Sequence, residues 1–521
     1  MSEKSSILKA AGVLGSATML SRILGMVRDM VVARLFGAAL ATDAFFAAFQ
    51  IPNLLRRFFA EGALTSAFVP VFSETIVKEG DKQAKELANL CFTLLFLVVT
   101  FVTLLGIIFS PLIIRLMFPG FAAVSGKFEL TVLLNRIMFP YLFFISLVAL
   151  CMGILNTLRH FFTPAISTVF LNLSMIGSAL LLRPFFQYPI TALAIGVLLG
   201  GLIQLLMQLP VLWRFGYRIR PAFAFNNQKL KKIALLLAPA TLGVGVYYLN
   251  ITVGNILASL LPQGSVSYLY YAQRLFEFPQ GVFTVSVAQA VLPTMSRQAA
   301  DNDLPGMKDS LNYGIRLTLF ITIPALVGLM VCSRPLIALL FMGGQFDYQM
   351  VVQSAKALVF YSCGLSFVAL VRVLAPAFYA LKDTRTPVFT AFIAFLLNLG
   401  FSLLLMKPLL HGGLALASSL AALGNMGLLL WFLHRKIGAL GGNAMLRSGF
   451  IAAASSLPMG LLAWWLLCFV DWSQPGARLL KSGMLSVTVA ASVACYALFS
   501  WLLRSSEATE IIALIRRKVA K

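Results

Sequence analysis

The chain contains about fourteen apolar stretches, and each is long enough to cross a lipid bilayer as a helix of about 20 residues. They occupy residues 7–36, 42–72, 88–117, 131–156, 162–183, 188–213, 232–261, 267–297, 311–342, 352–381, 387–406, 412–434, 449–470 and 480–503. Only 11% of the residues are charged, whereas a soluble protein carries about 25%. The sequence therefore predicts an all-α polytopic membrane protein with about 14 transmembrane helices.

The basic residues predict the orientation of these helices. The net charge is +23, from 41 Lys and Arg against 18 Asp and Glu. Basic residues gather in the loops after the even-numbered stretches, for example at Lys78, Arg218 and Lys382, and again at the C-terminus. Cytoplasmic loops carry such an excess, so we expect both termini in the cytoplasm. A cationic path for an anionic substrate is a second source of the positive charge.

An internal repeat divides the chain. Residues 67–73 resemble 290–296, residues 146–150 resemble 366–370, and residues 171–173 resemble 397–399. Chance similarity between apolar helices is the alternative, but the near-constant offset favours a repeat. It predicts two pseudo-symmetric six-helix lobes, residues 1–222 and 223–440, followed by two extra helices and a basic cytoplasmic tail in 441–521. Transporters built from such repeats bind substrate between the lobes and rock them to give alternating access.

Charged residues are concentrated in the first two stretches and in the eighth. Ionisable groups within a span are costly, so they face a cavity or a partner. Helical periodicity places Arg22 and Asp29 on one stripe, and Asp43, Arg57 and Glu61 on another. The substrate-binding candidates are Ser21, Arg22, Arg28, Arg56 and Arg274. The candidates for gating or ion pairing are Asp29, Asp43, Arg57 and Glu61.

Bases outnumber acids among these candidates, which favours an anionic substrate with a phosphate or pyrophosphate headgroup. Structural ion pairs that merely neutralise one another are the alternative. The sequence contains no Gly-rich loop ending in Lys-Ser or Lys-Thr, so ATP hydrolysis is not expected. We expect no enzyme activity, no cofactor and no nucleic-acid binding. The scattered histidines and cysteines predict no metal site.

Five motifs carry a resemblance to a known family. They are SRILGMVRD at 21–29, ATDAFF at 41–46, PNLLRRFFAEG at 52–62, EFPQG at 277–281 and VLAPAFY at 373–379. These segments resemble the MurJ/MviN family of the multidrug/oligosaccharidyl-lipid/polysaccharide exporter superfamily. The resemblance extends over essentially the whole chain, including the two C-terminal helices.

The resemblance implies a bacterial inner-membrane flippase that moves lipid II, the undecaprenyl-pyrophosphate-linked disaccharide-pentapeptide, from the cytoplasmic to the periplasmic leaflet. It implies two lobes around a cationic cavity, and a groove for the lipid tail at the last two helices. It points to Ser21, Arg22, Arg28, Asp29, Asp43, Arg56, Glu61 and Arg274. The cell-wall synthesis machinery is a further expected partner.

Some members of the family bind sodium through carboxylates in the seventh and eleventh spans. This chain offers Asn250, Asn398 and Ser402 there, but no Asp or Glu. These neutral oxygens are weak sodium candidates, which favours the membrane potential as the driving force.

Three other functions remain open at this level. A flippase for another polyprenyl-pyrophosphate oligosaccharide, of the O-antigen type, would share the cationic path. A membrane-embedded glycosyltransferase would need a large loop or an acid/base site that the sequence lacks. A non-transporting scaffold would not need charges within its spans.

Overall fold

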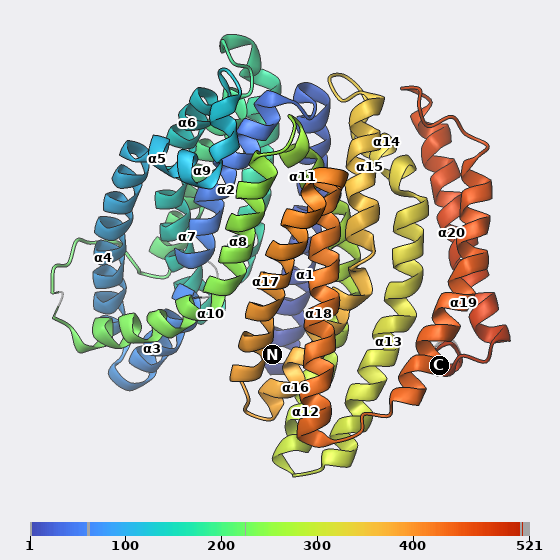
Figure 1. The fold of residues 1–521 in the computed structure, drawn as a ribbon. Coiled ribbons are helices and arrows are strands. Elements are labelled where there is room, and N and C mark those ends of the chain that lie inside the picture. The colour runs from blue at the N-terminus through green and yellow to red at the C-terminus, as the bar shows by residue number, and fades with distance from the viewer. Residues whose placement is uncertain (1–2, 60–62, 225, 511–512, 514–521) are drawn as a thin grey trace. The chain divides into compact units, whose positions relative to one another are not determined.

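The computed structural model describes residues 3–59, 63–224, 226–510 and 513, and throughout these the regular structure is helical (Figure 1). The one β-bridge in this part of the chain joins Gly343 to Phe346 within a turn. The all-α prediction is confirmed. Helices are the expected solution in a bilayer, because every backbone amide must find its hydrogen bond within the protein.

Two compact units divide the chain, Met1–Gly264 and Ser265–Lys521. The first contains α1 (Glu3–Phe36), α2 (Leu40–Phe59), α3 (Ala63–Glu79), α4 (Asp81–Ile108), α5 (Ser110–Met117), η1 (Pro119–Ala123), α6 (Lys127–Met138), α7 (Tyr141–Thr157), α8 (Phe162–Leu181), η2 (Arg183–Phe185), α9 (Thr191–Arg214) and α10 (Gln228–Ser259). The second contains α11 (Ser265–Pro279), η3 (Gln280–Thr284), α12 (Val285–Ala300), α13 (Leu304–Val331), α14 (Ser333–Phe341), α15 (Tyr348–Ser362), α16 (Leu365–Ala380), α17 (Arg385–Leu409), α18 (His411–Ile437), α19 (Gly442–Leu467) and α20 (Arg478–Leu502).

The first unit is built on a core of α3, α4 and α7, where the stacked rings of Phe68 and Phe72 lie 4.9 Å apart. Helix α9 approaches α8 closely through two glycines. A Cβ atom on Gly196 would lie 2.9 Å from Met175 Cα, and one on Gly200 would lie 3.1 Å from Leu171 Cα. Small residues permit this approach, which is a common way for membrane helices to associate.

Helix α10 packs with the first unit. It contacts α3, and two ion pairs join its first turns to the end of α3, Lys229 with Glu79 and Lys232 with Glu74. The compact units therefore meet in sequence at Gly264 and Ser265. The repeat had placed a lobe boundary between residues 222 and 223, and that pseudo-symmetric division stays a prediction.

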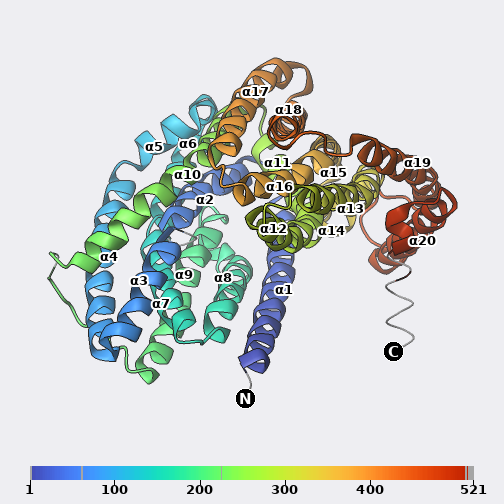
Figure 2. The ribbon, with the colours of Figure 1, turned by 90° about the horizontal axis from the view of Figure 1, so that it is seen from below.

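The second unit has its core between α12, α13, α16 and α18, with Leu311, Leu374 and Phe378 fully enclosed. Helices α19 and α20 lie outside the sequence repeat; α19 packs beside α13 in this unit, and α20 packs beside α19 (Figure 2). The hydroxyl of Tyr496 on α20 donates a hydrogen bond to the carbonyl of Phe320 on α13 at 2.7 Å.

Nine helices of the described chain are long and apolar enough to cross a membrane, or ten when the bent pair α15 and α16 counts as one span. The sequence had predicted about fourteen spans. The other predicted stretches are also helical: α2 carries charged residues, the eighth stretch is divided into α11 and α12, and α1 and α10 contain residues whose side chains lie outside the described set, to which this count is restricted.

Candidate functional site

Arg28 and Asp29, predicted on neighbouring faces of the first span, form a buried ion pair on α1. Arg28 donates from Nε and Nη2 to Asp29 Oδ1, at 3.0 and 2.7 Å. Both side chains are more than nine-tenths enclosed. A buried guanidinium needs such a partner, because taking an isolated charge out of water is very costly.

The same guanidinium joins two helices. Arg28 Nη1 donates to Asn172 Oδ1 on α8 at 3.1 Å. Asn172 Nδ2 in turn donates to the carbonyl of Ser21 at 3.3 Å and to that of Thr168 at 3.2 Å. The network therefore fixes α1 against α8 in the first unit, and it gives Arg28 a structural task in this conformation.

Ser21 and Arg22 lie two turns earlier on α1. The Ser21 backbone oxygen is held by Asn172, whereas Arg22 is exposed. Of the predicted substrate-binding arginines in the first unit, Arg22 is thus the most accessible. A charged, accessible guanidinium at this position is suited to an anionic headgroup.

The Arg28 network is one buried group of polar contacts, or node. Asp43, near the start of α2, is the acceptor in a second such node. Its Oδ2 atom accepts from Lys127 Nζ at 2.8 Å and from the backbone N–H of Gly264 at 2.7 Å. The Lys127 ammonium also lies 4.1 Å from the centre of the Phe121 ring. One carboxylate thus connects α2 and α6 with the segment that follows α10.

The second half of α2 carries Arg56, whose Nε donates to Asn53 Oδ1 at 3.1 Å. Arg56 is half-buried. Glu61 lies outside the described residues, and the side chain of Arg57 does too. The predicted pairing of Arg57 with Glu61 therefore stays a prediction.

Arg274 lies on α11 in the second unit. Its side chain is 38% exposed and stacks on Tyr270, with 4.9 Å from the guanidinium carbon to the ring centre. Arg274 Nη2 donates to the Tyr270 hydroxyl at 2.9 Å, and Nη1 lies 3.8 Å from Glu277 Oε2. This stacking orients the guanidinium plane while leaving part of it accessible.

The weak sodium candidates fall in both units. Asn250 lies on α10 of the first, and Asn398 and Ser402 are one turn apart on α17 of the second. Asn398 Oδ1 accepts a long hydrogen bond, 3.5 Å, from Ser418 on α18. Nowhere in the described chain do three His, Cys, Asp or Glu side chains gather as a metal site would need. The sodium assignment stays a prediction.

Two residues of these nodes were not among the sequence candidates. In the sequence Lys127 stands alone between two apolar stretches, so it was interpreted as a charged residue of a loop. Asn172 lies in the repeated Leu-Asn-Leu motif, and its counterpart Asn398 is likewise buried on α17. A polar residue at matching positions of both repeats was the available signal for Asn172.

The fold is shared with known transporters. A multidrug resistance MATE family transporter of the MOP superfamily, solved in an inward-facing conformation, aligns with a TM-score of 0.65 and 16% identity, over 82% of this chain and 98% of that one. Bundles of apolar helices with ionic groups enclosed between them define a multi-pass membrane protein, in which such groups are costly and need partners.

A family profile described as lipid II flippase MurJ matches residues 32–476, well over half of the chain. The chain belongs to the MurJ family. The Vibrio cholerae serotype O1 protein named "Probable lipid II flippase MurJ" is 39% identical over 499 residues, which cover 94% of this chain and 95% of that protein. The Burkholderia cenocepacia "Lipid II flippase MurJ" is 35% identical over 501 residues, 95% of each chain.

A solved structure described as "Lipid II flippase MurJ, inward closed conformation" aligns with a TM-score of 0.78 and 29% identity, over 94% of this chain and 98% of that one. The family and the fold predicted from the sequence motifs are therefore confirmed. The relatives are bacterial, and the chain is a multi-pass membrane protein.

Proposed function

We propose that this protein moves lipid II from the cytoplasmic to the periplasmic leaflet of the bacterial inner membrane, with both termini in the cytoplasm. The observation that carries the proposal is 39% and 35% identity, over 94% and 95% of the chain, with two proteins whose names describe lipid II flippases. The excess of basic loops after even-numbered stretches supports the orientation.

Different arginines then have different tasks. Arg22, Arg56 and Arg274 are exposed or half-buried and contact the pyrophosphate or the peptide carboxylates of the headgroup. Arg28 is held by Asp29 and binds substrate only when that pair opens.

Asp29 and Asp43 act as gate elements. The Asp43 carboxylate holds the backbone of Gly264, immediately before α11 begins. Release of Asp43 from Gly264 and Lys127 would free this connection, so making and breaking the node accompanies alternating access. Glu61 and Arg57 are proposed to act in the same way.

Binding of lipid II to purified protein in nanodiscs tests the proposal, with wild type beside Arg22→Ala and Arg274→Ala. Arg297→Ala is the matched control, because Arg297 lies on α12 and its side chain is 88% exposed. Loss of one charge-assisted contact of about 1.5–3 kcal/mol predicts affinity about 10- to 150-fold weaker in the first two variants and unchanged in the control.

A second polyprenyl-pyrophosphate oligosaccharide serves as competitor. Selective binding of lipid II supports the assignment. Equal binding of both lipids would instead favour a flippase for another lipid-linked oligosaccharide. Unchanged binding by both arginine variants would make these arginines structural.

A further inference from the structure

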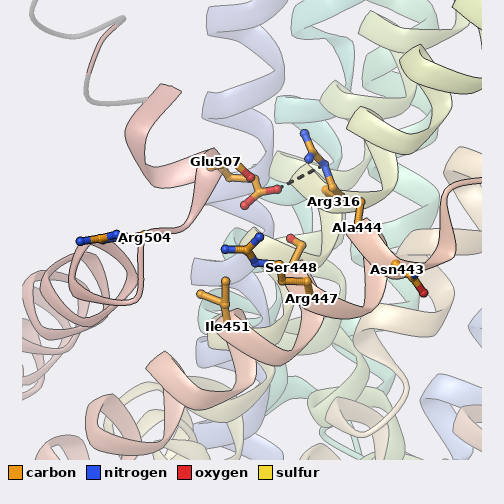
Figure 3. Close-up of a pocket in the computed structure, with 9 residues that line it drawn as sticks. Arg316, Asn443, Ala444, Arg447, Ser448, Ile451, Arg504 and Glu507 are labelled. Carbon is orange, nitrogen blue, oxygen red and sulfur yellow. Dashed lines mark ion pairs between the residues drawn. The ribbon is translucent and has the colours of Figure 1, made fainter.

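A polar pocket of about 410 Å³ lies in the second unit, between α13, the start of α19 and the segment after α20 (Figure 3). Arg316 enters it from α13, Arg447 and Ser448 from the first turns of α19, and Arg504 and Glu507 from the segment after α20. None of these residues belongs to the transport site proposed above.

The pocket carries excess positive charge. Glu507 is almost fully enclosed, and its Oε1 atom lies 3.3 Å from Arg316 Nε. Burial alone raises the pKa of Glu507, but hydrogen bonds from its own backbone and from Ser505 and Ser506, together with Arg316, outweigh burial and lower it. Glu507 is therefore ionised, and it balances one of three arginines.

The other two arginines are available to a ligand. Arg447 and Arg504 are exposed, and neither forms an ion pair with a carboxylate in the described part of the chain. Figure 3 shows the Arg447 guanidinium on the side of the pocket that faces Arg504. Two accessible guanidinium groups around one pocket fit the oxygens of a phosphate, to which each presents a planar fork of donors.

Ser448 supplies a further donor. It is 5% exposed, and its hydroxyl makes no hydrogen bond within the described residues. A buried hydroxyl without a partner costs about 1–3 kcal/mol, so native proteins rarely leave one. A ligand that accepts a hydrogen bond in the pocket would satisfy it.

The surroundings of the pocket indicate a lipid rather than a soluble anion. On α19, Leu446 and Phe450 flank Arg447 and are 74% and 75% exposed. The exposed apolar face continues along the helix through Leu457, Leu461 and Trp464. At the end of α20, the exposed side chains of Trp501, Leu502 and Leu503 precede Arg504. Tryptophan and basic side chains at the end of an apolar helix are typical of the membrane interface.

We propose that this pocket binds the phosphodiester of an anionic glycerophospholipid, whose acyl chains lie along the exposed apolar face of α19. Arg447, Arg504 and Ser448 hold the phosphate, and Glu507 keeps Arg316 in place. A lipid held there connects α13 with α19 and with the segment after α20, so it stabilises the second unit. The site does not depend on which lipid the protein transports.

The test measures binding of phosphatidylglycerol to delipidated full-length protein, with phosphatidylcholine and inorganic phosphate as separate arms. Wild type should bind phosphatidylglycerol and gain thermal stability. Arg447→Ala and Arg504→Gly should each weaken binding about fivefold, the factor that corresponds to about 1 kcal/mol per basic residue. The double variant should be about 25-fold weaker.

Arg504→Gly also controls for folding. Arg504 has φ 55°, just after α20, and the next residue, Ser505, donates its N–H to the carbonyl of Ser500 at 2.9 Å. Glycine is preferred at this helix-ending position, so the variant should fold at least as well as wild type. Arg297→Ala, outside the pocket, should bind like wild type.

Three outcomes would overturn the site. Equal stabilisation by phosphatidylcholine would remove the role of the phosphate charge. Equal stabilisation by inorganic phosphate would make it a site for a soluble anion. Weaker binding by Arg297→Ala to the same degree would reduce the effect to general surface charge.

Discussion

Lys127 and Asp43 form an ion pair in the interior of the first unit, with 2.8 Å between Nζ and Oδ2 and side chains only 3% and 1% exposed. Eighty-four residues separate them in the chain. Removing one partner of such a pair leaves the other charge buried and uncompensated, which typically lowers the free energy of unfolding by about 3–5 kcal/mol.

We therefore expect Lys127→Met and Asp43→Asn each to lower the thermal unfolding temperature strongly in detergent. The double variant should lose less than the two single losses added together, because neither charge then remains alone. Additive losses would show that the two residues act separately. Lys82→Met, at an exposed position in the first turn of α4, is the control and should unfold like wild type.

The Arg28 network gives a second prediction. Arg28 uses both edges of its guanidinium, on Asp29 and on Asn172, and lysine has no such fork. We expect Arg28→Lys to destabilise the protein by about 1.5–3 kcal/mol although the charge is kept. Arg22→Lys, on the exposed part of the same helix, should change stability little. Equal stability of Arg28→Lys and wild type would contradict the network.

The sequence predicted the helices well, because apolar stretches of 20 residues have few alternatives to a membrane helix. Helical periodicity, considered one helix at a time, also selected Arg28 and Asp29 on the first span and Asp43 on the second. It did not supply their partners. Asn172 and Lys127 reach Arg28 and Asp43 from helices far along the chain, and no local pattern encodes such contacts.

The assignment of α10 illustrates a second limit. The repeat counts helices in sets of six, and by that count α10 begins the second lobe. Its contacts, however, are with α2 to α5, and its first turns are tied to α3 by ion pairs. Repeats record the origin of a chain, whereas compact units follow the side chains that actually pack together.

Asp383 gives a pH-dependent prediction. In the loop before α17 it accepts hydrogen bonds from the backbone N–H of Arg385 at 3.1 Å and of Thr386 at 3.0 Å, and from Lys436 Nζ at 2.7 Å. Burial acts to raise the pKa of Asp383, but Lys436 and the Thr386 donors outweigh it and lower the pKa well below its usual 3.8. The ionised form is therefore favoured by folding.

The stabilisation by Asp383 should be fully present above about pH 4. It should begin to fall below that pH, where the unfolded chain takes up the proton, and should be lost completely only below the lower pKa of the folded state. Asp383→Ala should cost about 0.5–2 kcal/mol at neutral pH, the usual value of a helix cap. Asp383→Asn keeps an acceptor and should cost less. Thermal unfolding from neutral pH to pH 3 measures this, and a constant gap between wild type and Asp383→Ala would contradict it.

Gly120 lies where η1 passes the end of α10. A substitution at Gly120 therefore tests how tightly this part of the first unit is packed. Its N–H donates to Ser259 Oγ at 3.2 Å, and a Cβ atom there would lie 2.1 Å from the Ser259 carbonyl oxygen. Backbone cannot yield like a flexible side chain, so Gly120→Ala must displace η1. We expect a loss of about 1–3 kcal/mol.

Gly177 is the matched control for this change. It lies inside α8, and a Cβ atom there would meet nothing within 4 Å. Alanine is favoured over glycine inside a helix by up to about 1 kcal/mol, so Gly177→Ala should leave the unfolding temperature unchanged or raise it. Since η1 also carries Phe121, which supports the Lys127 ammonium, Gly120→Ala should be less damaging when Lys127 is already replaced by methionine. If the stability losses of Gly120→Ala and Lys127→Met simply add in the double variant, the packing of Gly120 and the ion pair of Lys127 are independent. That result would show that η1 does not position the buried ion pair.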